Sequence, residues 1–145
     1  MVSFVTRDQL VVFDPHGTHL PGGLLGLRCN FVEKGLRDSH PAQAAPFVWE
    51  GESALPFCDA DLRTPLDGTL FRLPLRTEQQ AQRSAIAQPS FTDAEVGGLL
   101  RDLAQAAGSM LLFLKNVESI EIYERPAEGG APRCVHRTAV GMPDG

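Results

Sequence analysis

The chain has 145 residues, of which 43% are hydrophobic and 21% charged, so it is long and apolar enough for one domain with a buried core, and wholesale disorder is excluded. Its 18 acidic side chains exceed the 13 Lys and Arg side chains, and the net charge of -5 excludes a general electrostatic attraction to nucleic acid or anionic lipid. The three cysteines are widely spaced and form no disulfide framework, which favours a reducing, cytoplasmic setting.

The first predicted element is a β-hairpin. Two β-rich runs, residues 2–6 and 9–13, are separated by two polar residues. The segment Asp14-Pro15-His16-Gly17 ends the second run, because proline cannot continue a central ladder. Glycines are dense in the following segment, residues 17–26, which therefore predicts a mobile loop.

A short helix and an irregular stretch are predicted next. Asn30 and Glu33 have capping-box spacing, which favours a helix over residues 31–37. Residues 41–67 contain several prolines without a hydrophobic period, so we expect irregular structure there. The aromatic side chains expected to pack from this stretch against a neighbour are Phe47, Trp49 and Phe57.

Residues 69–75 alternate in the manner of a half-buried strand, preceded by an Asp-Gly turn signal. Pro74 indicates that this strand ends there or lies at a sheet edge. The residues predicted to share its buried face are Thr69, Phe71, Leu73 and Leu75.

Two further capping boxes open predicted helices. Thr77 with Gln80 begins a short helix that must end before Pro89, and Thr92 with Glu95 begins the strongest helical pattern of the chain. Its predicted buried stripe consists of Val96, Leu99, Leu100, Leu103 and Leu111.

The sequence then returns to β structure. Residues 119–124 alternate as a strand, residues 128–130 form a turn, and residues 133–138 are the predicted hairpin partner.

Several residues could carry chemistry, but for each a structural role is the commoner explanation. His16 and His19 lie near Asp14, yet a metal site needs further ligands that only distant residues could supply. Asp59 and Asp61 suit a cation, although solvated loop acids are far more frequent. None of the cysteines has a local signature of a nucleophile.

The glycines of residues 17–26 could hold a phosphate through backbone N–H groups. No Lys-Ser or Lys-Thr pair follows them, and they do not join a strand to a long helix, so neither a P-loop nor a dinucleotide fingerprint is present. The residues alone therefore indicate a mixed α and β domain with a glycine-rich loop.

Three stretches, residues 10–17, 67–77 and 111–120, together resemble the repeated region of the sacsin and sacsin-like family. They occur in the same order and at similar separation as in that family. The resemblance runs from about residue 3 to residue 124 and does not cover the tail after residue 126.

The resemblance implies a fold of the Bergerat (GHKL) type, which gyrase, the ninety-kilodalton heat-shock chaperones, histidine kinases and MutL share. This fold is a two-layer α/β sandwich with a mixed sheet under helices and nucleotide held beneath a lid. The chain resembles its C-terminal half only. Residues 1–125 would include the lid region and an exit helix and strand, and residues 126–145 would be a tail or the start of a following segment.

The same resemblance implies roles for particular residues. Gly68 and Thr69 fall on the Gly-Thr turn that enters a sheet strand, where the threonine hydroxyl faces the adenine pocket. The lid loop would contain Gly17, Gly22 and Gly23. The side chains that become strand core are Phe71, Leu73 and Leu75.

Two signature segments of the superfamily have no counterpart in these residues. They are the helix with Glu and Asn that activates water and holds Mg²⁺, and the Asp-x-Gly-x-Gly segment that reads adenine. No catalytic residue or metal ligand is therefore predicted. ATP and Mg²⁺ are expected for a full-length parent but not for this chain alone.

Two functions follow from the resemblance. The first is a fragment of a sacsin-like, chaperone-related ATP-binding module that is not competent for nucleotide alone. The alternative is a non-catalytic protein-binding or scaffolding module that kept the fold and lost ATP binding. The expected partners are the missing half of the domain, other repeats of the parent and protein clients, but neither nucleic acid nor membrane. Arg72 and Arg76 could meet phosphate, although surface ion pairs are the more frequent role.

Overall fold

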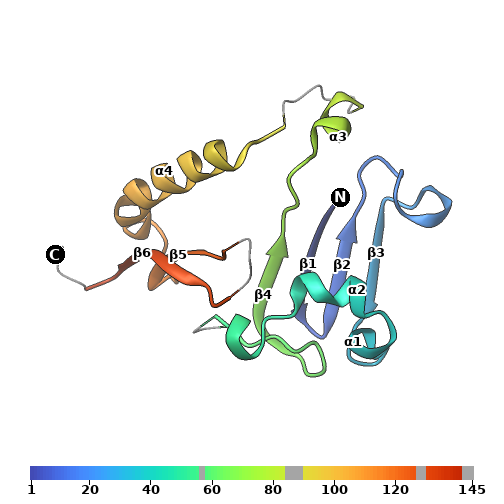
Figure 1. Cartoon of the computed structure of the whole chain (residues 1–145). Coiled ribbons are helices and arrows are strands. Elements are labelled where there is room, and N and C mark those ends of the chain that lie inside the picture. The colour runs from blue at the N-terminus through green and yellow to red at the C-terminus, as the bar shows by residue number, and fades with distance from the viewer. Residues whose placement is uncertain (56–57, 84–89, 127–129, 142–145) are drawn as a thin grey trace. The chain divides into compact units, whose positions relative to one another are not determined.

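The computed structural model describes residues 1–55, 58–83, 90–126 and 130–141 (Figure 1). The chain divides into two compact units, Met1–Pro74 and Leu75–Gly145. The first unit contains a four-stranded sheet, and the second contains a long helix and a two-stranded sheet. Among the described residues, no helix combines the length and the apolar character needed to cross a membrane.

The sheet of the first unit is entirely antiparallel. Its strands are β1 (Val2–Arg7), β2 (Gln9–Phe13), β3 (Gly26–Asn30) and β4 (Leu66–Arg72), in the order β3-β2-β1-β4 (Figure 1). The predicted hairpin of β1 and β2 is confirmed, with Thr6 opposite Gln9 and Arg7 in a left-handed conformation at the turn (φ 50°). Such a conformation suits the tight turns whose twist matches that of paired strands.

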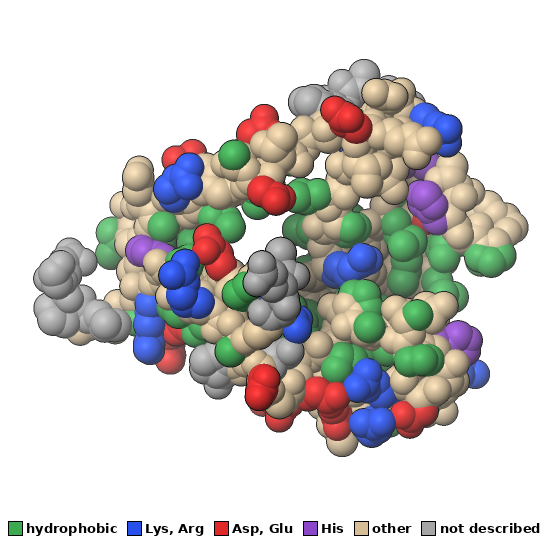
Figure 2. Space-filling model, viewed as in Figure 1, with side chains coloured by type: hydrophobic (Ala, Val, Ile, Leu, Met, Phe, Trp, Pro, Cys, Tyr) green, Lys and Arg blue, Asp and Glu red, His purple; other side chains and the backbone are tan. Residues whose placement is uncertain are grey.

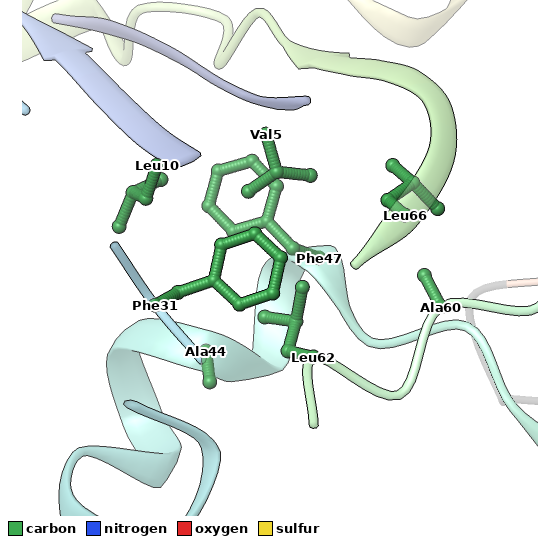
Figure 3. Packing of buried hydrophobic residues seen from close by; sticks show 8 residues of the cluster. All are labelled: Val5, Leu10, Phe31, Ala44, Phe47, Ala60, Leu62 and Leu66. Carbon is green, nitrogen blue, oxygen red and sulfur yellow. The ribbon is translucent and has the colours of Figure 1, made fainter. Parts of the chain in front are cut away.

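One face of this sheet carries the core of the unit. Alternation along the strands directs Val5 and Leu10 to this face, where both are buried. The segment 31–62 packs against them and contributes Phe31 at the centre (Figure 3). The complete buried cluster is Val5, Leu10, Phe31, Ala44, Phe47, Ala60, Leu62 and Leu66.

The covering segment consists of short helices. They are α1 (Leu36–Ser39), α2 (Pro41–Ala44) and the 3₁₀ turns η2 (Ala45–Phe47) and η3 (Gly51–Ser53). Phe47 is buried as expected and Trp49 is half-buried, whereas Phe57 lies outside the described residues.

The helix predicted over residues 31–37 begins later than expected, at Leu36. Asn30 does act as a cap, because its Oδ1 accepts hydrogen bonds from the backbone N–H of Val32 at 3.1 Å and of Glu33 at 3.0 Å. The residues it caps form turns, and the helix begins only after Gly35, which adopts a left-handed conformation (φ 53°). A left-handed residue cannot continue a right-handed helix, so the turn and α1 are separate elements.

Ion pairs fasten α1 to later parts of the covering segment. Arg37 Nη2 lies 2.6 Å from Glu50 Oε1, and Arg63 Nη2 lies 2.8 Å from Asp38 Oδ1. The surface of this part of the unit accordingly mixes acidic and basic side chains (Figure 2).

The strand expected over residues 69–75 begins and ends three residues earlier, and the side chains expected to be buried are exposed. β4 spans Leu66–Arg72, and Phe71, Leu73 and Leu75 are exposed rather than core residues. Leu70 faces the core instead, because it pairs with the buried Val5, and Leu66 lies four residues earlier on the same side. Pro74 lies beyond the end of the ladder.

The second unit contains α3 (Glu78–Gln82), α4 (Asp93–Leu111) and the hairpin of β5 (Ser119–Glu124) with β6 (Arg133–Ala139). Both predicted capping boxes are confirmed. The N–H of Gln80 donates to Thr77 Oγ1 at 3.3 Å, and the N–H of Glu95 donates to Thr92 Oγ1 at 3.3 Å. Pro89 and part of the predicted 128–130 turn lie outside the described residues.

The predicted buried stripe of α4 is only partly correct. Leu111 is buried, together with Ala107 and Ile122 of β5, but Leu99 is exposed. The 19-residue helix is about 28 Å long, whereas the strands that it contacts are about 20 Å long. The hairpin therefore buries one part of the stripe and leaves the rest uncovered within this unit.

The core of the first unit yields a direct stability prediction. Phe31→Ala should lower the free energy of unfolding by about 3–5 kcal/mol, because it removes a fully buried ring. Trp49, the single tryptophan of the chain, lies in this unit and reports its urea unfolding by fluorescence.

Phe13→Ala is the matched control, since Phe13 is 52% exposed on the same sheet. It should cost less than about 1 kcal/mol. Equal losses in the two variants would contradict the assignment of the core to the side of Phe31.

Candidate ligand face

The face of the first sheet that points away from the core carries three aromatic rings. Phe4 of β1 stacks with Phe13 of β2 at a centroid distance of 6.3 Å and contacts Phe71 of β4 at 5.0 Å. Phe13 and Phe71 are 52% and 61% exposed. We call Phe13, Phe4 and Phe71 the aromatic row, and the sheet face that bears it the open face.

Gly68 and Thr69 lie at one end of this open face. Thr69 Oγ1 is 2.9 Å from Thr6 Oγ1, and the Thr6 hydroxyl also donates to the carbonyl oxygen of Gly68 at 3.1 Å. Thr69 precedes Phe71 by two residues in β4, so both side chains share the open face. The two hydroxyls form a polar pair beside the aromatic row.

Gly68 has a backbone conformation that favours glycine, with φ 137°, and no atom lies within 4 Å of the place that a Cβ would take. The space beside its backbone is therefore open. The arrangement offers a hydroxyl pair beside open backbone to a ligand.

The loop of residues 14–25 is organised by Asp14, which is fully buried. Asp14 Oδ2 accepts hydrogen bonds from the N–H of His19 at 2.5 Å and of Leu20 at 3.0 Å, and the backbone N–H of Asp14 donates to the carbonyl of Leu25 at 2.9 Å. These hydrogen bonds of Asp14 therefore hold the two ends of the glycine-rich loop together.

Close packing within the loop requires glycine at position 17. A Cβ on Gly17, whose φ is 62°, would lie 3.0 Å from the carbonyl oxygen of Gly23. Gly22 and Gly23 are also left-handed and belong to the 3₁₀ turn η1 (Pro21–Gly23). The two ends of the glycine run therefore contact each other.

The electrostatics of Asp14 favour its charged form. Burial raises the pKa of Asp14, but the N–H groups of His19 and Leu20, together with the charge of the His19 ring, outweigh burial and hold the pKa below its usual value. A carboxylate is the better acceptor for two backbone donors, so ionisation and loop closure support each other.

The structure does not bring the two predicted groups of site residues together. Thr69 pairs with Thr6 near the β1–β2 turn, whereas the 14–25 loop follows Phe13, which pairs with Val2 at the other end of β1. Thr6 and Val2 are four residues apart along β1, which corresponds to about 13 Å. Gly68 and Thr69 are therefore distant along the strands from the base of the loop that bears Gly17, Gly22 and Gly23.

The structure gives the other residues that the sequence analysis considered a role in a turn or a strand. Asp61 Oδ1 accepts from the backbone N–H groups of Arg63 and Thr64 at 2.8 and 3.1 Å, which lowers the pKa of Asp61 and makes it a turn residue. Arg72 lies on β4 opposite Ser3. Within the described ranges, no group of three or more His, Cys, Asp or Glu residues could hold a metal ion.

Cys29 and Cys58 do not have the surroundings of a nucleophile. Burial raises the pKa of the Cys29 and Cys58 thiols above the usual value, so both stay protonated near neutral pH. All three cysteines are free thiols.

Sequence reasoning missed Thr6, the closing role of Asp14 and the aromatic row. The alternation of Val2, Phe4 and Thr6 within β1 was the available signal for an open face.

Comparison of the sequence with known families identifies the family of this chain. The sequence model of the family described as Sacsin domain matches residues 1–137. The chain belongs to this family. The match covers the whole first unit and continues through α4 and β5 into β6, so it extends past residue 124, where the resemblance in the sequence ends.

The chain is also similar to human sacsin, with 24% identity over 143 residues. The aligned part covers 94% of this chain but only 3% of human sacsin. The Sacsin-domain chain therefore corresponds to a small portion of that much longer relative.

The low pKa of Asp14 leads to a pH-dependent prediction. Because the folded pKa is depressed, the carboxylate stabilises the fold above its unfolded pKa of about 3.9, and this contribution is lost as the pH falls through the folded value. Asp14→Asn should therefore unfold at lower urea than the native chain near neutral pH.

The difference between the two proteins should shrink as the pH falls from about 5 to about 3. Urea titrations followed by Trp49 fluorescence measure it. A difference that stays constant across this range would contradict a charged Asp14 as the closing group of the loop.

Proposed function

We propose that the chain is part of a chaperone-related, ATP-binding module of a sacsin-type protein and that it does not hold nucleotide by itself. The observation that supports this is the hydroxyl pair of Thr6 and Thr69 on an open face beside the unobstructed backbone of Gly68. In the Bergerat fold that the resemblance implies, a threonine after glycine faces the adenine pocket. We further propose a cytoplasmic setting, which the three free thiols suit.

The energetics explain why the chain alone is insufficient. One hydroxyl contact contributes about 0.5–1.5 kcal/mol net, whereas micromolar affinity needs about 8 kcal/mol. Thr69 already shares a hydrogen bond with Thr6, so a ligand gains less than a free hydroxyl would offer. The remaining contacts, including those to Mg²⁺ and to the adenine amino group, would come from another segment of the parent.

The loop with Gly17, Gly22 and Gly23 has a smaller role in this proposal than the resemblance implies. It is closed by Asp14 at the opposite end of the strands from Thr69. To act as a lid over Thr69, it would have to open at Asp14 and extend along the sheet.

A protein-binding module is the second candidate, because two rings of the aromatic row, Phe13 and Phe71, are exposed. Aromatic rings bury a large apolar area at small entropic cost and are enriched where proteins bind one another. This function needs no nucleotide and would use protein clients or other repeats of the parent as partners.

Titration of Mg-ATP up to about 10 mM, followed by backbone amide NMR shifts, distinguishes these functions. We expect weak, millimolar shifts centred on Thr6, Gly68 and Thr69, because the open face offers only part of a site. Thr69→Val should remove them. Thr18→Val, which alters an exposed threonine of the loop, should leave them unchanged.

Saturable binding in the low micromolar range would contradict the statement that the chain alone is not competent. Shifts centred elsewhere would contradict the assigned face. Absence of any shift around Thr69 would favour the protein-binding module.

A further inference from the structure

A series of hydrogen bonds near the β1–β2 turn orients the guanidinium group of Arg28. Arg28 is an exposed residue of β3, and its Nε donates to Gln9 Oε1 at 2.9 Å. Gln9 is held in turn, because its Nε2 donates to Asp8 Oδ1 at 2.8 Å. The other carboxylate oxygen of Asp8, Oδ2, accepts from Asn30 Nδ2 at 2.7 Å. The side chain that accepts from Arg28 is therefore itself fixed in place.

The remaining donors of the Arg28 guanidinium have no partner among the described residues. The bond to Gln9 engages only Nε, and none of the ion pairs between described residues involves Arg28. Asp8 is the acidic member of the series, but both of its carboxylate oxygens accept from side-chain amides. The two Nη atoms of Arg28 thus form an oriented fork that can donate to an added acceptor.

Strand pairing places Arg28 beside the aromatic row. Arg28 is opposite Val11 of β2, and Val11 is opposite Phe4 of β1. Residues directly opposite each other in paired strands share a face, so Arg28 belongs to the open face. Phe13 follows Val11 by two residues on β2 and stacks with Phe4. β3 and β1 are two strand spacings apart, about 10 Å, so one small ligand can reach both Arg28 and these rings.

We propose that Arg28 and the aromatic row bind a small ligand in which an oxyanion is attached to a flat apolar ring. The Nη atoms of Arg28 bind the oxyanion, a phosphate or a carboxylate, through charge-assisted hydrogen bonds that suit the fork of a guanidinium. The apolar ring lies over Val11 and contacts Phe4 and Phe13, since aromatic rings attract one another in offset and edge-to-face arrangements.

Gln9 is a positioning residue in this site. It holds Nε and so restricts the guanidinium before the ligand arrives, which lowers the entropic cost of binding. The site is nevertheless shallow and exposed to water, which weakens each charged contact. We therefore expect a Kd of about 1–10 mM for a ligand with a single ring.

Titration with phenyl phosphate up to about 50 mM, followed by the NMR signals of arginine Nε–H groups and of phenylalanine rings, tests the proposal. The signals of Arg28 Nε–H and of the Phe4 and Phe13 rings should shift together and saturate. Inorganic phosphate should bind at least about 3-fold more weakly, because it leaves the rings uncovered. Phenylacetate in place of phenyl phosphate shows which oxyanion the site prefers: tighter binding of one assigns that group to the ligand.

Three variants separate the charge of Arg28 from its orientation. Arg28→Gln should weaken binding of phenyl phosphate at least about 5-fold, because the charged fork is lost. Gln9→Leu keeps the charge but should weaken binding about 2-fold and move the Arg28 Nε–H signal of the free chain. Arg63→Gln is the matched control and should bind as the native chain does, since Arg63 is an exposed arginine paired with Asp38 of α1.

Three results would overturn the proposal. They are the absence of saturable shifts at Arg28 and the two rings, equal affinities for inorganic phosphate and phenyl phosphate, and equal weakening by Arg28→Gln and Arg63→Gln. The site does not rest on the proposed function, because the probes contain no nucleotide. The shifts of Thr6, Gly68 and Thr69 with Mg-ATP test that function separately.

Discussion

The rest of the first unit depends on the packing of Phe31 and the segment 31–62 against one side of its sheet. This packing buries Val5 and Leu10 and fixes which residues of each strand face inward. Because strand side chains alternate, the same constraint fixes what faces outward, namely the aromatic row and the pair of Thr6 and Thr69. The candidate ligand face is thus a consequence of where the core lies.

The sequence was most informative where structure is decided locally. Thr77 and Thr92 cap helices through bonds to residues only three positions away, and both helices begin where the capping pattern predicts. The hairpin of β1 and β2 is likewise a contact between neighbours in the chain. These features need no knowledge of distant partners.

The errors arose where a distant or backbone effect overrides the local pattern. Leu70 rather than Phe71 faces the core because it pairs with the buried Val5, more than sixty residues away in the chain. Gly35 adopts a left-handed conformation that delays α1, although the cap at Asn30 forms as its spacing suggests. The closure of the glycine-rich loop by Asp14 also could not be predicted from glycine content alone.

The open face carries both of the features on which the two proposed functions rest. It carries polar groups at one end and exposed rings along its length, and it belongs to a chain of the Sacsin domain family that corresponds to 3% of human sacsin.

The most direct measurement of this account is the accessibility of the phenylalanine rings in the native chain. A soluble paramagnetic agent broadens the NMR signals of rings that it can approach. The account predicts strong broadening for Phe13 and Phe71 and protection for Phe31 and Phe47, which are buried in the core. Protection of Phe13 and Phe71, with broadening of Phe31 and Phe47, would contradict it.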